Sequence, residues 1–317
     1  MAYTITILLG ILFFGRFLYG QTTTSLDYAR LGDAYQVKQQ FPEAELAYRK
    51  AISVLPAQRE QMHARAILLR NLGSVLTAEA RFDDALAALN QASALTNKEA
   101  FKDSRLAAEI LNSVGVIYFN RAEMRKAENS FLQATRIDFD NNDVLDVALT
   151  NLGSLYQRQR QYTKAEAAYK RSLEVTEARL GKFHWNLSVT LDKLGSLFRA
   201  IGRYKDAKLN FERSLSILEE AGTPNEKLTM ETLHGLAETY IDEHDAPGAE
   251  PLLTRAVEIA RRRAVRPADT AESIEVLETY SKVLRDLRKP VEAQRVHEET
   301  RRIRASMTLT VRATEAK

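Results

Sequence analysis

The histidines and one acidic run are the residues of this sequence whose chemistry could hold a metal ion. No two histidines form a His-Glu-x-x-His pair or another recognised ligand spacing. The run from Asp138 to Asp143 begins like a calcium loop, which needs Gly at its sixth position and Glu at its twelfth. Asp143 and Leu149 stand at those positions, so we interpret the run as a solvated acidic turn and expect no metal ion and no cofactor. The histidines are His63, His184, His234, His244 and His297.

Other signatures of catalysis are missing from the sequence. It has no cysteine, which excludes disulfides, thiolate catalysis, cysteine zinc sites and lipoprotein anchoring. No phosphate loop, dinucleotide fingerprint or Gly-x-Ser-x-Gly elbow occurs, so we expect that the protein is not an enzyme. The 45 basic and 42 acidic residues leave a net charge of +3, which is too balanced to favour nucleic acid as a partner.

The first residues form a segment of a different kind. Residues 5–14 are mainly apolar, and Arg16 follows them. This run is shorter than the ~20 residues that span a bilayer, and its length fits the apolar region of a signal peptide. Leu18 matches an Ala-x-Ala cleavage pattern poorly, and no Lys or Arg precedes the run, so an uncleaved anchor is an alternative. We predict that residues 1–20 are a signal peptide or N-terminal membrane anchor and that the protein is exported, either periplasmic or secreted, or membrane-anchored.

A small residue followed twelve positions later by alanine occurs seven times along the chain. The steps between these pairs are 41, 42, 38, 42, 42 and 44 residues, which indicates an internal repeat. Large apolar residues lie four positions before each small residue and three positions after it, a spacing that places them on one helical face. The pairs are Gly32 and Ala44, Gly73 and Ala85, Gly115 and Ala127, Gly153 and Ala165, Gly195 and Ala207, Ala237 and Ala249, and Ser281 and Ala293.

Each repeat is expected to be a helical hairpin, because small residues let two helix axes approach near ~8 Å while large residues interdigitate around them. Proline follows the break between the helices at Pro42, Pro247 and Pro290, where the first turn of a helix does not need its missing donor. The run from Thr223 to Glu226 favours a capping box, with Pro224 as the first helical residue.

One hairpin cannot bury its apolar face alone, so the hairpins should stack on one another. We predict a single solenoid over residues 24–305 and a flexible C-terminal tail over residues 306–317, where the apolar pattern stops. The hairpins are expected at residues 24–56, 59–97, 101–139, 143–181, 185–221, 225–264 and 268–305.

This repeat resembles the tetratricopeptide motif, whose signature is fitted by Leu152–Tyr156 together with Tyr162–Tyr169. The common period is 34 residues, and the ~42 residues here resemble the longer, kinesin-light-chain-like variety. Leu180–His184 and Val189–Leu191 match the linker and helix start of that variety, with Trp185 in place of the usual proline. The resemblance implies an all-α fold, a right-handed α-α superhelical solenoid of about seven hairpins, with a concave groove lined by the first helix of each hairpin.

Proteins of this kind usually bind a peptide or a partner domain in that groove, which an amide side chain suits because it both donates to and accepts from an extended backbone. The alternative is that these side chains are only solvated polar faces. The family's chaperone-binding carboxylate clamp is absent, because Ala29, Asp33, Glu109 and Ser113 stand where it needs basic or amide residues. The residues that the resemblance places in the groove are Asn71, Ser74, Asn112, Asn151, Ser154, Gln157, Arg158, Lys193 and Arg199.

The sequence therefore predicts a non-enzymatic protein–protein interaction module that binds a peptide or partner protein in its groove. We expect a monomer that meets a membrane only through its first residues. The alternative is a structural scaffold of the cell envelope that self-associates through the ends of the solenoid. An enzyme with its site hidden in the groove is a third hypothesis, which the missing motifs disfavour.

Overall fold

The computed structural model describes residues 24–96, 104–137, 143–221, 225–264 and 270–315 of the chain. They form two compact units, one ending at Asn151 and the other beginning at Leu152. Every regular element in the described residues is a helix. The expected all-α fold of helical hairpins is therefore confirmed.

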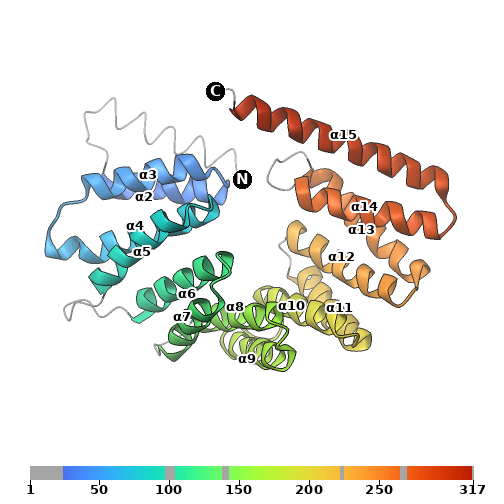
Figure 1. The fold of residues 1–317 in the computed structure, drawn as a ribbon, viewed down its shortest axis with the longest axis horizontal. Coiled ribbons are helices and arrows are strands. Elements are labelled where there is room, and N and C mark those ends of the chain that lie inside the picture. Colours follow the sequence, from blue (N-terminus) through green and yellow to red (C-terminus); the bar gives the residue numbers. More distant parts are fainter. Residues whose placement is uncertain (1–23, 97–103, 138–142, 222–224, 265–269, 316–317) are drawn as a thin grey trace. The chain divides into compact units, whose positions relative to one another are not determined.

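The first unit consists of antiparallel helical hairpins (Figure 1). We call the first helix of each hairpin its A-helix and the second its B-helix. The last A-helix, α8 (Leu145–Arg158), crosses the boundary between the two units. The remaining elements are α2 (Ser25–Val37), α3 (Phe41–Val54), the short 3-10 helix η1 (Arg59–Gln61), α4 (Met62–Ala78), α5 (Phe82–Thr96), α6 (Ser104–Asn120) and α7 (Met124–Arg136).

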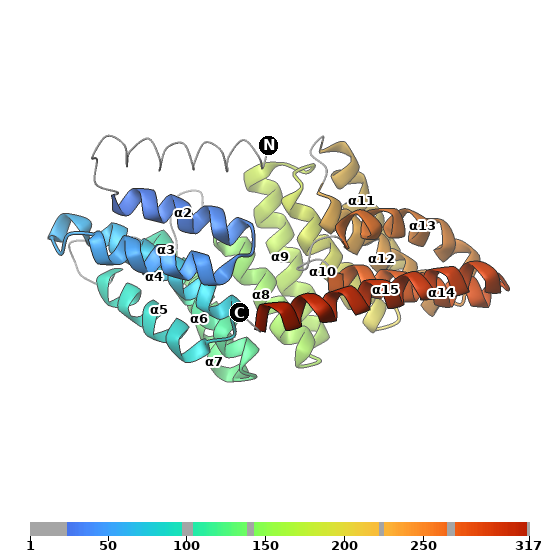
Figure 2. The same ribbon diagram turned by 90° about the horizontal axis from the view of Figure 1, so that it is seen from above.

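The second unit continues the same alternation of A-helices and B-helices. Figure 2 shows α9, α10 and α11 running side by side, and each of these helices packs against the next. The elements are α9 (Tyr162–Leu180), α10 (Asn186–Ala200), α11 (Tyr204–Glu220), α12 (Glu226–Asp242), α13 (Ala246–Arg263), α14 (Thr270–Asp286) and α15 (Pro290–Glu315).

In the five A-helices whose small residue is glycine, this glycine faces a large side chain of the B-helix sixteen positions later. A Cβ atom on Gly153 would lie 2.5 Å from Cε1 of Tyr169, and one on Gly32 would lie 2.6 Å from Cε1 of Tyr48. The ring of Phe211 fills the same kind of space opposite Gly195. Both tyrosines and Phe211 are almost fully buried, so the repeated glycine makes room for the largest side chains of the core.

All the A-helices end in the same turn. The residue seven positions after each small residue has a positive φ, from 57° to 75°, which is the left-handed conformation of a Schellman cap. The amide of the next residue then donates to a carbonyl five positions earlier, as Arg203 does to Phe198 at 2.8 Å. Only Gly202 has the residue type that this conformation prefers. The other residues in this position are Gln39, Ala80, Ala122, Arg160, His244 and Arg288.

The observed helix starts agree in part with those expected from the sequence. Proline stands in the first turn of α3, α13 and α15, as expected. Thr223 and Pro224, which the expected capping box includes, lie outside the described residues. α12 begins one residue after Asn225, whose side chain accepts from the Leu228 amide. A capping box does occur at α2, where the Thr24 and Asp27 side chains each accept from the other's backbone amide.

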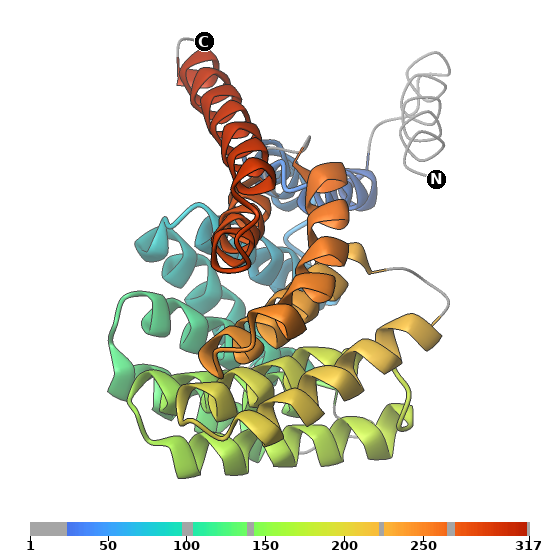
Figure 3. The ribbon, with the colours of Figure 1, turned by 90° about the vertical axis from the view of Figure 1, so that its right-hand side faces the viewer.

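The last helix differs from the prediction. α15 continues to Glu315, past the end of its partner α14 (Figure 3), so the expected tail over residues 306–317 is helical as far as Glu315. No proline or glycine follows Pro290 in the chain, and nothing in the local sequence therefore stops the helix.

The predicted signal or anchor segment over residues 1–20 lies outside the described residues. Within the described residues, none of the helices combines the length and the apolar character that crossing a bilayer requires. The single solenoid over residues 24–305 stays a prediction, as does the site of cleavage.

Candidate binding surface

Successive A-helices contact one another within each unit. α4 packs against α6, and α10 packs against α12, in addition to the contacts of each helix with its own B-helix. Polar side chains that project from neighbouring A-helices are therefore brought within reach of one another. We call the exposed and half-buried side chains of the A-helices the A-helix surface.

In the first unit this surface carries amide groups bonded from one A-helix to the next. Asn71 Nδ2 donates to Oδ1 of Asp33 at 3.4 Å, and Asn151 Nδ2 donates to Oδ1 of Asn112 at 2.9 Å. Asn112 lies three residues before its glycine and Asn151 two residues before its own, and the two side chains are direct partners. Ser74 is half-buried on the same helix as Asn71. We call Asn71, Asn112 and Asn151 the amide row; its hydrogen bonds join neighbouring A-helices.

Charged side chains that were not expected from the sequence lie beside these amides. One guanidinium nitrogen of Arg70 on α4 lies 2.9 Å from Glu109 on α6. Arg105 lies 3.2 Å from the other oxygen of Glu109 and 2.6 Å from Asp143. Arg70 stands at the same repeat position as Asn112, three residues before the glycine, so the repeat register could have identified it.

In the second unit, Ser154 and Gln157 are bonded to a buried tyrosine. The Tyr169 hydroxyl lies 3.1 Å from Ser154 Oγ and 3.0 Å from Gln157 Oε1. Burial raises the pKa of Tyr169 to about 12, which keeps the hydroxyl protonated and able to donate. A partner that used Ser154 or Gln157 would have to compete with this internal contact.

The first unit repeats this tyrosine contact. The Tyr48 hydroxyl lies 2.7 Å from Asp33 Oδ1 and 2.8 Å from Gln36 Oε1. Burial first, and then the hydrogen bond to Asp33, raise the pKa of Tyr48 above its ordinary value. The residues one and four positions after the glycine are therefore held by the B-helix tyrosine wherever the chain has one. Their first role is to lock the hairpin.

The three basic residues that the resemblance places in the groove are not equivalent in the structure. Arg199 on α10 is paired with Glu238 and lies 3.3 Å from Asp242, both on α12. Lys193 and Arg158 are exposed. Arg199 is thus part of an interhelical ion-pair cluster with Glu238 and Asp242, which leaves Lys193 as the more accessible cation of α10.

His234 lies beside this cluster. Its Nε2 atom is 3.0 Å from the Thr279 hydroxyl on α14, and burial lowers the pKa of the imidazole. Within the described residues there is no group of three or more His, Asp or Glu side chains arranged to hold a metal ion. The run from Asp138 to Asn142 lies outside the described residues.

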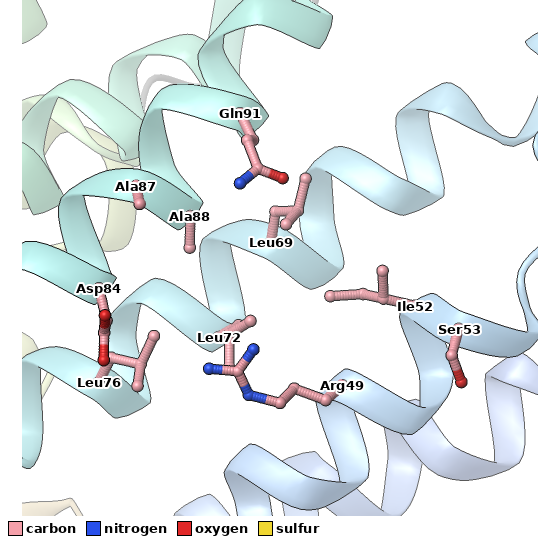
Figure 4. A pocket seen from close by; sticks show the side chains of 10 residues that line it. All are labelled: Arg49, Ile52, Ser53, Leu69, Leu72, Leu76, Asp84, Ala87, Ala88 and Gln91. Atoms are coloured by element: carbon pink, nitrogen blue, oxygen red, sulfur yellow. The ribbon is translucent and has the colours of Figure 1, made fainter.

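The first unit also has a hollow that the sequence did not reveal (Figure 4). It has a volume of about 350 Å³ and is formed by α3, α4 and α5. Its floor is the buried row Leu69, Leu72 and Leu76, and Arg49 and Asp84 stand at its rim. The short side chains of Ala87 and Ala88 leave the space open.

A larger hollow of about 750 Å³ lies at the start of the first unit, between the beginning of α2, the end of α3 and the beginning of α4. Its lining is mostly apolar and includes Leu26 and Val54, whose side chains are 58% and 39% exposed. The first hairpin thus presents uncovered apolar surface, which a soluble protein usually buries against something.

The comparison with known proteins identifies these hairpins. A family model described as tetratricopeptide repeat matches residues 64–138 and 145–220. The chain is a tetratricopeptide repeat protein. This family has a generally non-catalytic interaction fold, and its members bind protein or peptide partners. The chain is accordingly a protein–protein interaction module.

Solved structures share the fold. A Rap protein complexed with competence and sporulation factor is 14% identical, with a TM-score of 0.62, over 90% of this chain and 75% of that chain. A kinesin-light-chain-type protein from Podosopora anserina, whose TPR-like repeats are nearly identical to one another, is 18% identical to this chain. The TM-score is 0.54, over 65% of this chain and 97% of that one. At these identities the likeness shows the fold alone.

Among curated proteins, the uncharacterized protein ycf37 of Porphyra purpurea is 30% identical to this chain over 80 residues. The matched residues are 25% of this chain and 44% of ycf37, so this chain spans less than half the length of that relative.

Proposed function

We propose that this protein binds an extended segment of a partner protein on its A-helix surface, and that Asn71, Asn112 and Asn151 bind the backbone of that segment. The observation that supports this most is the Asn112–Asn151 pair. Its 2.9 Å hydrogen bond uses Nδ2 of Asn151 and Oδ1 of Asn112. Asn112 Nδ2 and Asn151 Oδ1 make no other hydrogen bond within the described residues, so the pair offers one donor and one acceptor.

An extended backbone needs such a combination, because its amides and carbonyls alternate along the chain. The same pair fixes both side chains, which lowers the entropy that ordering them on binding would cost. The Rap protein that shares the fold was solved with competence and sporulation factor, which fits binding of a partner by this fold.

The test is affinity capture from native cell extract, with the full chain as bait beside an Asn71→Ala/Asn151→Ala variant. The matched control is Asn90→Ala/Asn129→Ala, which makes the same chemical change on exposed positions of the B-helices α5 and α7. We expect a partner that the wild type and the control hold and the A-helix variant loses, although all three are equally helical. Equal capture by the A-helix variant and the control would count against the amide row.

A second candidate function is self-association, which the uncovered apolar residues of the first hairpin favour. Leu26, Val37 and Leu46 are 58%, 85% and 72% exposed. A scaffold of this kind would show a mass that rises with concentration in light scattering, and Leu26→Asp/Leu46→Asp would reduce it. A mass that stays at one chain over a hundredfold range of concentration would remove this candidate.

We also propose that the protein acts outside the cytoplasm, because an apolar run of signal-peptide length stands near its start and the chain has no cysteine to mispair there. Cell fractionation followed by N-terminal sequencing tests this. Export with a new N-terminus near Gln21 supports a signal peptide, membrane retention of the whole segment supports an anchor, and an intact cytoplasmic chain contradicts both.

A further inference from the structure

A half-buried aspartate with one fully buried carboxyl oxygen lies where the hairpin α10–α11 meets the hairpin α12–α13. Asp192 on α10 has its Oδ2 atom 2.7 Å from the hydroxyl oxygen of Thr232 on α12, and Thr232 is fully buried. The other carboxyl oxygen, Oδ1, is buried and has no hydrogen-bond partner among the described residues. An ionised carboxylate in this place would leave a buried, charged oxygen without a hydrogen-bond donor from the described residues, which is costly.

The proton count at Thr232 also favours a neutral acid. The Thr232 hydroxyl oxygen lies 2.8 Å from the Leu228 carbonyl as well as 2.7 Å from Asp192 Oδ2. A hydroxyl has one proton, so it cannot donate to both acceptors. If Asp192 is protonated, its Oδ2–H donates to Thr232, and the Thr232 proton goes to Leu228. Both short contacts are then satisfied.

The hydroxyls of Thr232 and of Ser214 on α11 act to lower the pKa of Asp192, but burial outweighs them. From α11, Ser214 Oγ lies 3.3 Å from the Thr232 hydroxyl and 3.4 Å from the Ser188 carbonyl, both long for hydroxyl contacts. From α9, the Ser172 hydroxyl faces Thr190 of α10 at 3.4 Å.

The charged groups near Asp192 act on its pKa in opposite directions. Glu231 on α12 acts to raise the pKa of Asp192, and Lys193 on α10 acts to lower it. Lys227 and, from α14, Glu272 stand close to Glu231 and to each other, with Lys227 Nζ 2.7 Å from Glu272. The main cause of the shift is burial, which raises the pKa of Asp192 to about 7.

We propose that Asp192 is a protonation-controlled joint between the two hairpins, in which the neutral acid holds α10 to α12 and loss of its proton loosens them. This goes beyond binding of a partner and does not depend on it. When α10 and α12 separate, the carboxyl meets water and its pKa returns to the ordinary value near ~4. Between that pH and about 7 the closed joint keeps a proton that the open joint has lost.

The sign of the pH effect follows from this difference. Closing is most favourable below about pH 4, becomes up to about tenfold less favourable per pH unit as the pH rises, and levels off above about 7, where both states are ionised. The joint is therefore tightest in acid, opposite to the usual effect of acid on paired carboxylates.

The test compares urea unfolding of the full chain and its Asp192→Asn variant from pH 4 to 8. Asn is nearly the same size and is always neutral. Other titrating groups cancel in the ratio of the two unfolding constants, so the wild-type constant should rise relative to the variant between pH 4 and 7 and then level off. Asp286→Asn, the same change at an exposed position of α14, should follow the wild type. A ratio that is flat with pH would overturn the proposal.

A second measurement needs no folded variant. The carboxyl carbon of Asp192, followed by NMR in the wild-type protein, should titrate with a midpoint near 7. A midpoint below about 5 would show an ordinary, ionised aspartate and would overturn the proposal.

Discussion

Gly153 on α8 and Tyr169 on α9 are complementary in size, since a Cβ atom at residue 153 would lie 2.5 Å from Cε1 of the tyrosine ring. Tyr169 is fully buried and its hydroxyl is bonded to Ser154 and Gln157. The ring therefore has no free direction in which to move. The contact sets how closely the two helices approach.

The first prediction concerns this contact. Gly153→Ala should lower the free energy of unfolding by about 1–3 kcal/mol, because overpacking outweighs the helix propensity gained by alanine. Tyr169→Leu added to Gly153→Ala should recover part of that loss, since the chain itself pairs Ala237 with Leu253 at the same positions. A double-mutant cycle in urea measures the coupling. Additive losses would mean that the ring is not what excludes the Cβ atom.

The second prediction concerns the left-handed turns after the A-helices. Ala122 has a φ of 59°, which costs an alanine about 1 kcal/mol relative to glycine. Ala122→Gly should therefore stabilise the protein by about that amount in urea or thermal unfolding. Ala178→Gly, the same change inside α9, is the control and should destabilise it by about 1 kcal/mol. A loss of stability in both variants would contradict the role of the turn.

These turns show where sequence reasoning succeeds and where it stops. The positions of the small residues predicted the first six hairpins to within a few residues, because the packing of Gly153 and its equivalents against large side chains requires that spacing. The last hairpin runs to Glu315, beyond its predicted end at residue 305. The left-handed residue seven positions after each small residue cannot be recognised from the sequence, since only Gly202 has the residue type that this conformation prefers. The remaining turns adopt the conformation because tertiary packing outweighs a local cost of about 1 kcal/mol.

The binding surface was predicted less completely for a related reason. The repeat register correctly places Asn112 and Asn151 on neighbouring helices, but their mutual hydrogen bond depends on the offset between hairpins, which one repeat does not determine. The Tyr169 hydroxyl likewise reaches Ser154 and Gln157 only once the two helices have packed. Which of the predicted residues meet a partner stays a prediction.

The third prediction concerns the ion pairs of Arg199. Its partners Glu238 and Asp242 are partly exposed, so the pairs should contribute about 0.5–1 kcal/mol at low salt. Arg199→Met should lose that amount in urea unfolding, and the loss should shrink in ~1 M sodium chloride because the Debye length falls to about 3 Å. The control is Arg171→Met, at an exposed position of α9. A loss independent of salt would indicate that packing of the Arg199 stem matters more than its charge.

The fourth prediction separates folding from binding in the amide row. The Asn112–Asn151 hydrogen bond joins α6 to α8 across half-buried positions, so breaking it with Asn151→Ala should cost about 1 kcal/mol of stability. Asn112→Ala should cost about the same, and the double variant should cost little more than either, because both remove one contact.

The affinity for the captured partner, unlike the stability, should depend on the contacts that each asparagine makes with that partner. If Asn112 Nδ2 and Asn151 Oδ1 each bind the partner's backbone, each single variant loses its own contact and displaces the other amide, so each should weaken binding about tenfold. The measurement is a fluorescence anisotropy titration with a labelled segment of that partner, and Asn90→Ala is the control. If a variant loses stability but keeps its affinity, the Asn112–Asn151 pair serves only to join α6 to α8 and does not bind the partner.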